Sequence, residues 1–202
     1  MARPQSIDEH ELINRLSRVF RDIGFEGASL AMLAAAAGLQ KASLYHRFPR
    51  GKQQMAEEVL AAALSWFAAN ILSPLTGKGP PAQRIATVVA NLDAFYANGR
   101  EACLLNVLAS PLRQGGPFAA VIKGAFEALI KAFAALARDA GHAPIEARVR
   151  AERVVMLLHG SLVVCRGLGS SKPFKLFLAA LPSELLASPR RARNRNISAG
   201  KA

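Results

Sequence analysis

Cysteine and acidic residues are scarce in this chain of 202 residues. The two cysteines, Cys103 and Cys165, are too few for a disulfide framework, and both lie in apolar stretches. We therefore expect buried free thiols in a reducing compartment. No signal-like segment precedes the first helical pattern, and no apolar run reaches the roughly 18–20 residues that span a bilayer. A cytoplasmic protein without a membrane partner is expected.

Motifs for catalysis and for cofactors are also missing. The four histidines show no His-x3-His spacing, and no Cys-x2-Cys pair is present to hold a metal. Neither Gly-x4-Gly-Lys-Ser nor Gly-x-Gly-x2-Gly occurs to bind nucleotide phosphates. The sequence therefore predicts no metal, no cofactor and no enzyme activity. A helical enzyme built on Cys103 or His159 is the alternative, but no motif supplies the general base that it would need.

Positive charge is what the chain has in excess. Lys and Arg number 26 against 14 Asp and Glu, so the net charge is +12. Residues 38–52 hold four basic residues and no acidic one, and residues 187–202 hold five more basic residues. Two basic clusters favour a polyanionic partner, whereas a solvated basic surface is the alternative for either cluster alone.

Helical periodicity continues along the chain, and nothing before residue 50 resembles a strand. The expected fold is all-α with three parts. Residues 1–51 form a helix-turn-helix DNA-binding domain, and residues 52–187 form a helical effector-binding and dimerisation domain. Residues 188–202 form a basic tail with few apolar residues, which we expect to be disordered.

Some helix boundaries are also predicted. Ser6 and Glu9 form a capping box at the start of the first helix, and Gly24 is expected to end it. A long helix is expected from Lys52 to Leu72, followed by a loop rich in Pro and Gly at Ser73–Pro81.

The spacing of small and apolar residues between Ser29 and Lys52 is typical of a helix-turn-helix. Gly38 tolerates the left-handed conformation that ends a helix, and the small Ala34 lets a second helix cross closely. Leu44 and Phe48 recur at i, i+4 and fix that second helix against a core. In such motifs the second helix lies in the major groove of DNA. An ordinary helical hairpin is the alternative.

The same stretch resembles the DNA-binding domain of the tetracycline-repressor (TetR) family. The resemblance covers about residues 7–60, and the Gly-Lys after Phe-Pro is closest to the branch that includes flavonoid- and antibiotic-responsive repressors. Gln40 departs from the pattern, because the family usually has Ser or Thr capping the recognition helix there. The matching residues are Ala34, Ala37-Gly38-Leu39, Ser43-Leu44-Tyr45-His46, Phe48-Pro49 and Lys52.

A recognition helix at about residues 40–47 would present several side chains to double-stranded DNA. Gln40 can pair with adenine, Lys41 can reach guanine acceptors, and Ala42 can meet a thymine methyl. Ser43, Tyr45 and His46 match family positions that contact phosphates or base edges, although Tyr45 could instead be a core aromatic and His46 a structural imidazole. Lys52, at a helix start, suits a phosphate. The predicted DNA-binding residues are Ser29, Gln40, Lys41, Ala42, Ser43, Tyr45, His46 and Lys52.

The body offers apolar helices with isolated polar or aromatic groups, which is typical of a small-molecule pocket. Asp93 is the one acidic residue between Val59 and Arg100, so a neutral or weakly acidic, apolar effector is expected rather than a cation. Each residue taken alone could instead belong to the core. The predicted pocket residues are Trp66, Phe67, Phe95, Tyr96, Asn106, Met156 and His159.

Two long helices, expected at Pro117–Ala140 and Pro144–Gly167, are too apolar to face water on all sides. They could form a four-helix homodimer interface with a second copy, or pack within one chain. The predicted interface residues are Ala125, Leu129, Ala132, Leu136, Val155, Leu158 and Leu162.

The sequence thus predicts a transcriptional regulator, a repressor that binds a palindromic operator as a dimer and is released by a small molecule. A non-specific, nucleoid-type DNA-binding protein is the alternative, suggested by the net charge and the basic tail. The short recognition helix argues against that alternative.

Overall fold

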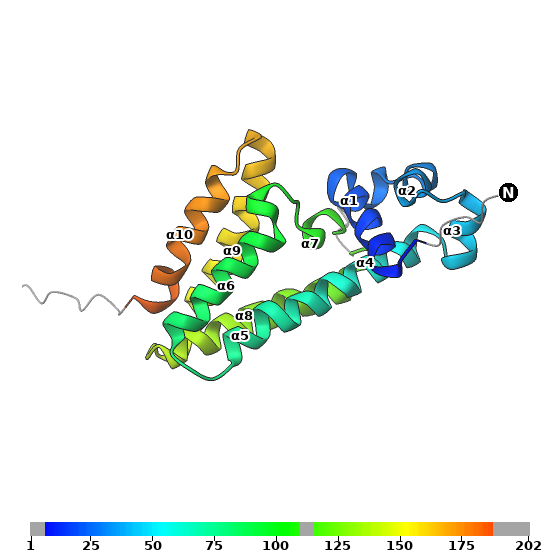
Figure 1. The fold of residues 1–202 in the computed structure, drawn as a ribbon. Coiled ribbons are helices and arrows are strands. Elements are labelled where there is room, and N and C mark those ends of the chain that lie inside the picture. The colour runs from blue at the N-terminus through cyan, green and yellow to red at the C-terminus, as the bar shows by residue number, and fades with distance from the viewer. Residues whose placement is uncertain (1–6, 110–114, 188–202) are drawn as a thin grey trace, which may run out of the picture.

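The structure is a computed structural model that describes residues 7–109 and 115–187. Its described part contains helices and no strand, and the all-α class predicted from the periodicity is confirmed. The molecule is elongated, with a head of three helices at one end and a larger helical body at the other (Figure 1). The head consists of α1 (Glu9–Gly27), α2 (Leu30–Ala37) and α3 (Lys41–Arg47). The body consists of α4 (Lys52–Phe67), η1 (Ala68–Leu72), α5 (Ser73–Thr76), α6 (Pro81–Phe95), η2 (Ala97–Gly99), α7 (Leu104–Val107), α8 (Ala119–Asp139), α9 (Pro144–Leu168) and α10 (Lys172–Leu186).

The first helix begins later than the capping box predicts. Its N-cap is Asp8, whose carboxylate accepts the N–H of Glu11 at 3.4 Å, while Ser6 lies outside the described residues. Gly24 leaves the helical conformation, with φ 73° and ψ 179°, so the regular helix stops there as predicted and a short helical segment continues to Gly27. A Cβ at this position would lie 3.2 Å from the carbonyl oxygen of Val107, so glycine also allows α1 to approach α7.

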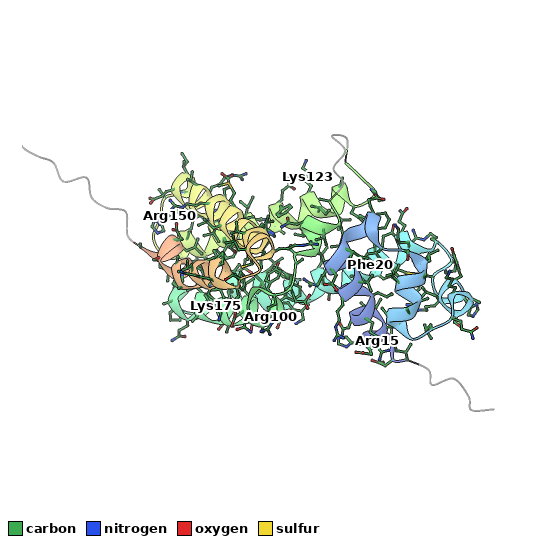
Figure 2. All side chains as sticks on the ribbon, turned by 90° about the horizontal axis from the view of Figure 1, so that it is seen from above. Arg15, Phe20, Arg100, Lys123, Arg150 and Lys175 are labelled. Carbon is green, nitrogen blue, oxygen red and sulfur yellow. The ribbon has the colours of Figure 1, made fainter. Side chains whose placement is uncertain are left out.

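The core of the head is built from the apolar positions that recur at helical spacing. Phe20, Leu33 and Phe48 are fully buried, and Leu44 is almost so. Figure 2 shows Phe20 inside the head, among the side chains of its helices. Met55 of α4 is also fully buried, and α1 packs along α4. The start of α4 therefore completes the head, and its continuation enters the body.

The central helix, formed by α4, η1 and α5, is continuous from Lys52 to Thr76, whereas the sequence predicted an end at Leu72. The helix continues because it can include Pro74. Pro74 lacks the N–H that would bond to the carbonyl of Asn70 four residues earlier. The intervening η1 is a π-helical turn, which widens the helix. Asn91 of α6 donates its side-chain amide to that Asn70 carbonyl at 2.8 Å. The loop therefore begins at Gly77 and not at Ser73.

By length and composition alone, Lys52–Thr76 is the one helix in the described ranges that is apolar enough to cross a membrane. Core helices of soluble proteins pass the same test. Helix α1 packs against α4, and α6 and α8 pack against η1 and α5.

Helices α8 and α9 pack along each other, and α10 covers α9 and α6. This packing corrects the predicted dimer contacts. Leu136 and Leu158 are fully shielded within one chain, and the other predicted side chains are buried there too, except the half-buried Ala125. Packing inside the chain therefore accounts for all the predicted interface residues except Ala125, namely Leu129, Ala132, Leu136, Val155, Leu158 and Leu162.

Candidate nucleic-acid interface and ligand cavity

The turn between α2 and α3 is fixed by local hydrogen bonds. Ser29 caps α2, with its hydroxyl accepting the N–H of Met32 at 3.2 Å. Gly38 ends α2 in the left-handed conformation, with φ 67° and ψ 28°. The N–H of Leu39 then donates to the carbonyl of Ala34 at 3.0 Å, which closes the helix stop that the glycine predicts.

Helix α3 buries one side and exposes the other. Leu44 is 1% exposed, whereas Tyr45 is 47% exposed, so Tyr45 is not a core aromatic. His46 is exposed as well, which also excludes a buried imidazole. Gln40 is the N-cap of α3 but makes no capping bond, so its amide remains available. The exposed side of the helix carries Gln40, Lys41, Ala42, Ser43, Tyr45 and His46.

Arg47 anchors α3 to the two helices beside it. Its guanidinium pairs with the carboxylate of Glu9 on α1 and lies 2.9 Å from that of Glu58 on α4. The hydrogen bond to Glu9 is the main cause of the raised pKa of Arg47. The same group lies 4.6 Å from the ring centroid of Phe48. Arg47 therefore positions the helix and is not free for DNA.

Two further basic side chains of the cluster at residues 38–52 also contact protein groups. Lys52 Nζ donates to the carbonyl of Phe25 at 2.8 Å and lies 4.4 Å from the centroid of the Phe25 ring. Arg50 pairs with Glu57 at 2.7 Å. An ammonium has three donors, so Lys52 can still reach a phosphate. Lys41 is the one basic residue of this cluster without such a contact among the described residues.

The head together with the first residues of α4 carries no net charge. Residues 7–58 contain seven Lys and Arg and seven Asp and Glu. The body, residues 59–186, contains 13 basic and 7 acidic residues. Figure 2 shows Arg150 and Lys175 on the body, away from the head. The basic character of the candidate DNA surface is therefore local to α3 and its flanks.

A cavity of about 230 Å³ lies in the body between α4, α6, α7 and α8. Three of the predicted pocket residues, Phe67, Phe95 and Tyr96, stand on its wall. The rings of Phe67 and Phe95 meet edge to face with centroids 4.8 Å apart, and those of Phe95 and Tyr96 do so at 5.0 Å. The rest of the wall is Leu60, Ala63, Leu64, Leu72, Cys103, Leu104, Leu105, Ala125, Ala128 and Leu129.

The polar groups of the cavity wall are the hydroxyl of Tyr96 and the thiol of Cys103, 3.6 Å apart. A tight turn brings the two residues together, with Ala97 and Asn98 both in the left-handed region (φ 47° and 61°). Burial raises the pKa of both the phenol and the thiol. The thiol of Cys103 therefore stays protonated. The phenol of Tyr96 is protonated as well, so it is not a general base for the thiol.

The structure corrects the other four pocket assignments. Met156 is 67% exposed on the outside of α9. His159 is buried against the ring of Phe126 at 4.8 Å, and desolvation lowers its pKa to about 4. Asn106 borders a separate depression beside Gly24. Trp66 stacks on Phe95 at 4.7 Å but lines the cleft between α1 and α4.

The aliphatic part of the cavity wall was not predicted from the sequence, because the predicted set consists of aromatic and polar residues and one methionine. Leu60, Leu64 and Phe67 recur at i, i+4 and i+7 on one side of α4, a spacing from which this wall could have been predicted.

Within residues 7–109 and 115–187, no group of three His, Cys, Asp or Glu side chains lies close enough together to hold a metal ion.

Arg21 connects the cavity wall to the head. This α1 side chain is buried, and its guanidinium donates to the carbonyl of Ala102, next to Cys103. It lies 4.9 Å from the ring centroid of Phe95 and 3.6 Å from the carboxylate of Glu101. Arg21 of the head therefore contacts one wall residue, Phe95, and the residue that precedes another, Cys103.

The sequence profile of the bacterial regulatory proteins of the tetR family matches residues 12–59, which include α2, α3 and the start of α4. A curated relative is the HTH-type transcriptional repressor KstR2 of Mycolicibacterium smegmatis, which is 39% identical over 57 residues. That match spans 28% of this chain and 27% of the relative, so the chain aligns with about a quarter of the relative's length.

Solved structures share the whole fold at low sequence identity. A TetR transcriptional regulator from Legionella pneumophila superposes with a TM-score of 0.71 at 16% identity, covering 91% of this chain and 100% of the other. A cysteine-substituted form of the TetR family transcriptional regulator CifR, in complex with 26-base-pair operator DNA, gives a TM-score of 0.69 at 23% identity. That match covers 93% of this chain and 100% of CifR.

Proposed function

Because the chain belongs to the tetR family of bacterial regulatory proteins, we propose that it is a dimeric transcriptional repressor released from its operator by a small molecule. The observation that carries the proposal is the exposed side of α3, held by the Gly38 turn on one side and by Arg47 on the other. A short helix anchored in this way is the geometry that reads base edges in a major groove.

In the proposed complex, α3 enters the major groove with its N-terminal end. Gln40, Lys41 and Ala42 face base edges, since an amide, an ammonium and a methyl complement adenine, guanine and thymine respectively. The hydroxyl and imidazole groups nearby, and the ammonium at the start of α4, contact the phosphates and fix the register. These positioning residues are Ser29, Ser43, Tyr45, His46 and Lys52.

A stripe on the outside of α9 supports the proposed dimer. Val149, Met156 and Val163 are between 58% and 67% exposed and recur at intervals of seven residues, on one side of the helix. Gly160 and Gly167 lie near this stripe, and nothing stands within 4 Å of the Cβ that each lacks, so a second helix can approach closely. Covering this stripe would bury apolar surface that the single chain leaves in water. We place the dimer interface here.

Two connections support release by an effector bound in the cavity. The long central helix contributes Lys52 to the head and Phe67 to the cavity wall. Arg21 supplies the second connection, through Phe95 and Ala102. A ligand that shifts either wall changes the orientation of the head, and half-sites about 34–36 Å apart tolerate little displacement. DNA must weaken ligand binding by the same factor by which ligand weakens DNA binding.

The alternative of a non-specific DNA-coating protein is disfavoured by the charge distribution. Such binding depends on neutralising many phosphates. The head, residues 7–58, has equal numbers of basic and acidic residues, and three of the four basic side chains around α3 contact protein groups.

The deciding experiment is the selection of bound duplexes from a random pool with the full chain. We expect a palindrome whose half-sites are separated by about one helical turn, bound at least about a thousandfold more tightly than random duplex at physiological salt. Recovery of sequences without a common half-site would contradict the proposal and support the non-specific alternative.

A further inference from the structure

The wall of the body cavity carries no charged side chain. The guanidinium of Arg21 contacts the wall residue Phe95 but is held by Ala102 and Glu101. A carboxylate or an ammonium entering the cavity would lose its hydration without gaining an opposite charge, which is strongly unfavourable. The occupant must therefore be neutral.

The cavity also limits the size of its occupant. An apolar cavity of about 150 Å³ binds benzene. The cavity between α4 and α8 measures about 230 Å³, so it has room for one or two rings, roughly ten to fifteen non-hydrogen atoms. The aromatic wall of Phe67, Phe95 and Tyr96 offers both ring edges and ring faces to such a molecule.

The hydroxyl of Tyr96 is weakly satisfied. Its one hydrogen-bond partner in the described part of the chain is the sulfur of Cys103, at 3.6 Å. Sulfur is a poor acceptor, and the residue Tyr96 is 1% exposed, so bulk water does not supply a better one. A carbonyl or ether oxygen delivered by a ligand would be a better acceptor and would bond at about 2.7 Å.

We infer that the effector is a neutral, mainly apolar molecule of one or two rings with a single oxygen acceptor, and that this oxygen takes the Tyr96 hydroxyl from Cys103. The inference deepens the proposed function and rests on it, because it assumes that the cavity is the effector site. Tyr96 is then the residue that selects an oxygen-bearing ring over the corresponding hydrocarbon.

The test compares three probes of similar size on the full chain by calorimetry. 1-Tetralone carries one ketone oxygen, tetralin is the matched hydrocarbon, and 1-naphthoate is the charged analogue. One neutral hydrogen bond makes tetralone bind about fivefold more tightly than tetralin. Naphthoate should bind at least about tenfold more weakly than tetralone.

Three variants identify the donor. Tyr96→Phe keeps the ring and should abolish the tetralone preference, leaving tetralin binding unchanged. Cys103→Ser gives the hydroxyl a stronger intramolecular acceptor and should reduce the preference, whereas Cys103→Ala removes the competitor and should preserve or increase it. Melting curves of each variant without probe show whether it is folded, and the two Cys103 variants test the inference even if Tyr96→Phe is unstable.

The outcomes are distinct. Equal affinity for tetralone and tetralin, a preference that survives Tyr96→Phe, tight binding of naphthoate, or binding of none of the probes would each overturn the inference. Operator binding is measured separately by anisotropy of the selected duplex. If tetralone binds through Tyr96 but leaves operator affinity unchanged, the ligand class stands and the sensor role in the proposed function fails.

Discussion

Arg47 Nη2, at the end of α3, lies 2.9 Å from Oε2 of Glu58 on α4. The same guanidinium reaches Glu9 on α1, so one side chain fixes the recognition helix to both of its neighbours. Both partners of the 2.9 Å pair are about one-third exposed, and such pairs contribute only about 0.2–1 kcal/mol to stability. These ion pairs therefore affect the orientation of α3 more than the stability of the head.

Replacing Glu58 should therefore weaken operator binding without unfolding the head. Glu58→Gln loosens Arg47, and we expect operator affinity to fall about two- to fivefold. The matched control is Glu57→Gln at the adjacent position. It removes the same charge, but Glu57 pairs with the exposed Arg50 and not with Arg47. Fluorescence anisotropy at one salt concentration compares the two variants. Equal operator affinities of the two variants would show that the Arg47 anchor does not orient α3.

Lys41 should contribute more to operator binding than Lys52, whose ammonium already donates to the carbonyl of Phe25. Lys41→Ala should cost about 1–3 kcal/mol if the side chain reads a guanine, and the loss should appear on the selected operator but not on random duplex. A uniform loss on both duplexes, with a smaller salt slope, would identify a phosphate contact instead. Lys123→Ala, an exposed lysine of the body, is the control.

The outer stripe of α9 should determine the oligomeric state. Met156→Glu or Val163→Glu places a carboxylate in an apolar interface, so we expect the variant to sediment as a monomer and to bind the palindrome much more weakly. Leu176→Glu on α10 is the control, because Leu176 is equally exposed but lies on another helix. If the α9 variants remain dimeric, the interface is elsewhere.

Asn91 should stabilise the chain by replacing the donor that Pro74 lacks. Asn91→Ala leaves the carbonyl of Asn70 without its partner, which costs about 1–3 kcal/mol in urea unfolding. Pro74→Ala restores a backbone N–H to the helix. The cost of Asn91→Ala should therefore be smaller in a Pro74→Ala background. An equal cost in both backgrounds would refute this account of the central helix.

His159 should make stability fall on the acid side. Its folded pKa is about 4, below the value of about 6.5 in the unfolded chain, so the unfolded state binds more protons between these values. The stability that the chain gains from keeping this imidazole neutral is fully present above about pH 6.5 and is lost as the pH falls toward 4. Between pH 7 and pH 5 the unfolding free energy should drop by about 2 kcal/mol from this group. His159→Phe should lack that part of the drop, and an unchanged pH profile would contradict the assignment.

Features that depend on neighbouring residues could be predicted from the sequence. The stop of α2 at Gly38 follows from the left-handed conformation that glycine adopts without strain, and it is confirmed. The burial of Leu44 and Phe48 follows from helical spacing, and so does the all-α class. The family resemblance is also confirmed, because it rests on a short contiguous motif.

Helix α9 shows where periodicity fails. It is apolar on several sides, so spacing does not tell which side faces its own chain. The sequence prediction assigned Leu158 to a second copy and Met156 to a pocket, whereas the structure buries the first and exposes the second. Packing against α8 and α10 makes that choice, and those helices are distant along the chain.

The sequence by itself determined the all-α class, the turn at Gly38 and the burial of Leu44, since each depends on contacts within a few residues. Only the tertiary structure decided which charges are used internally and what the cavity contains. Arg47 meets Glu9, 38 residues away, and Arg21 meets Ala102, 81 residues away. Such pairings depend on how whole helices pack, and a count of basic residues in a window does not contain that information.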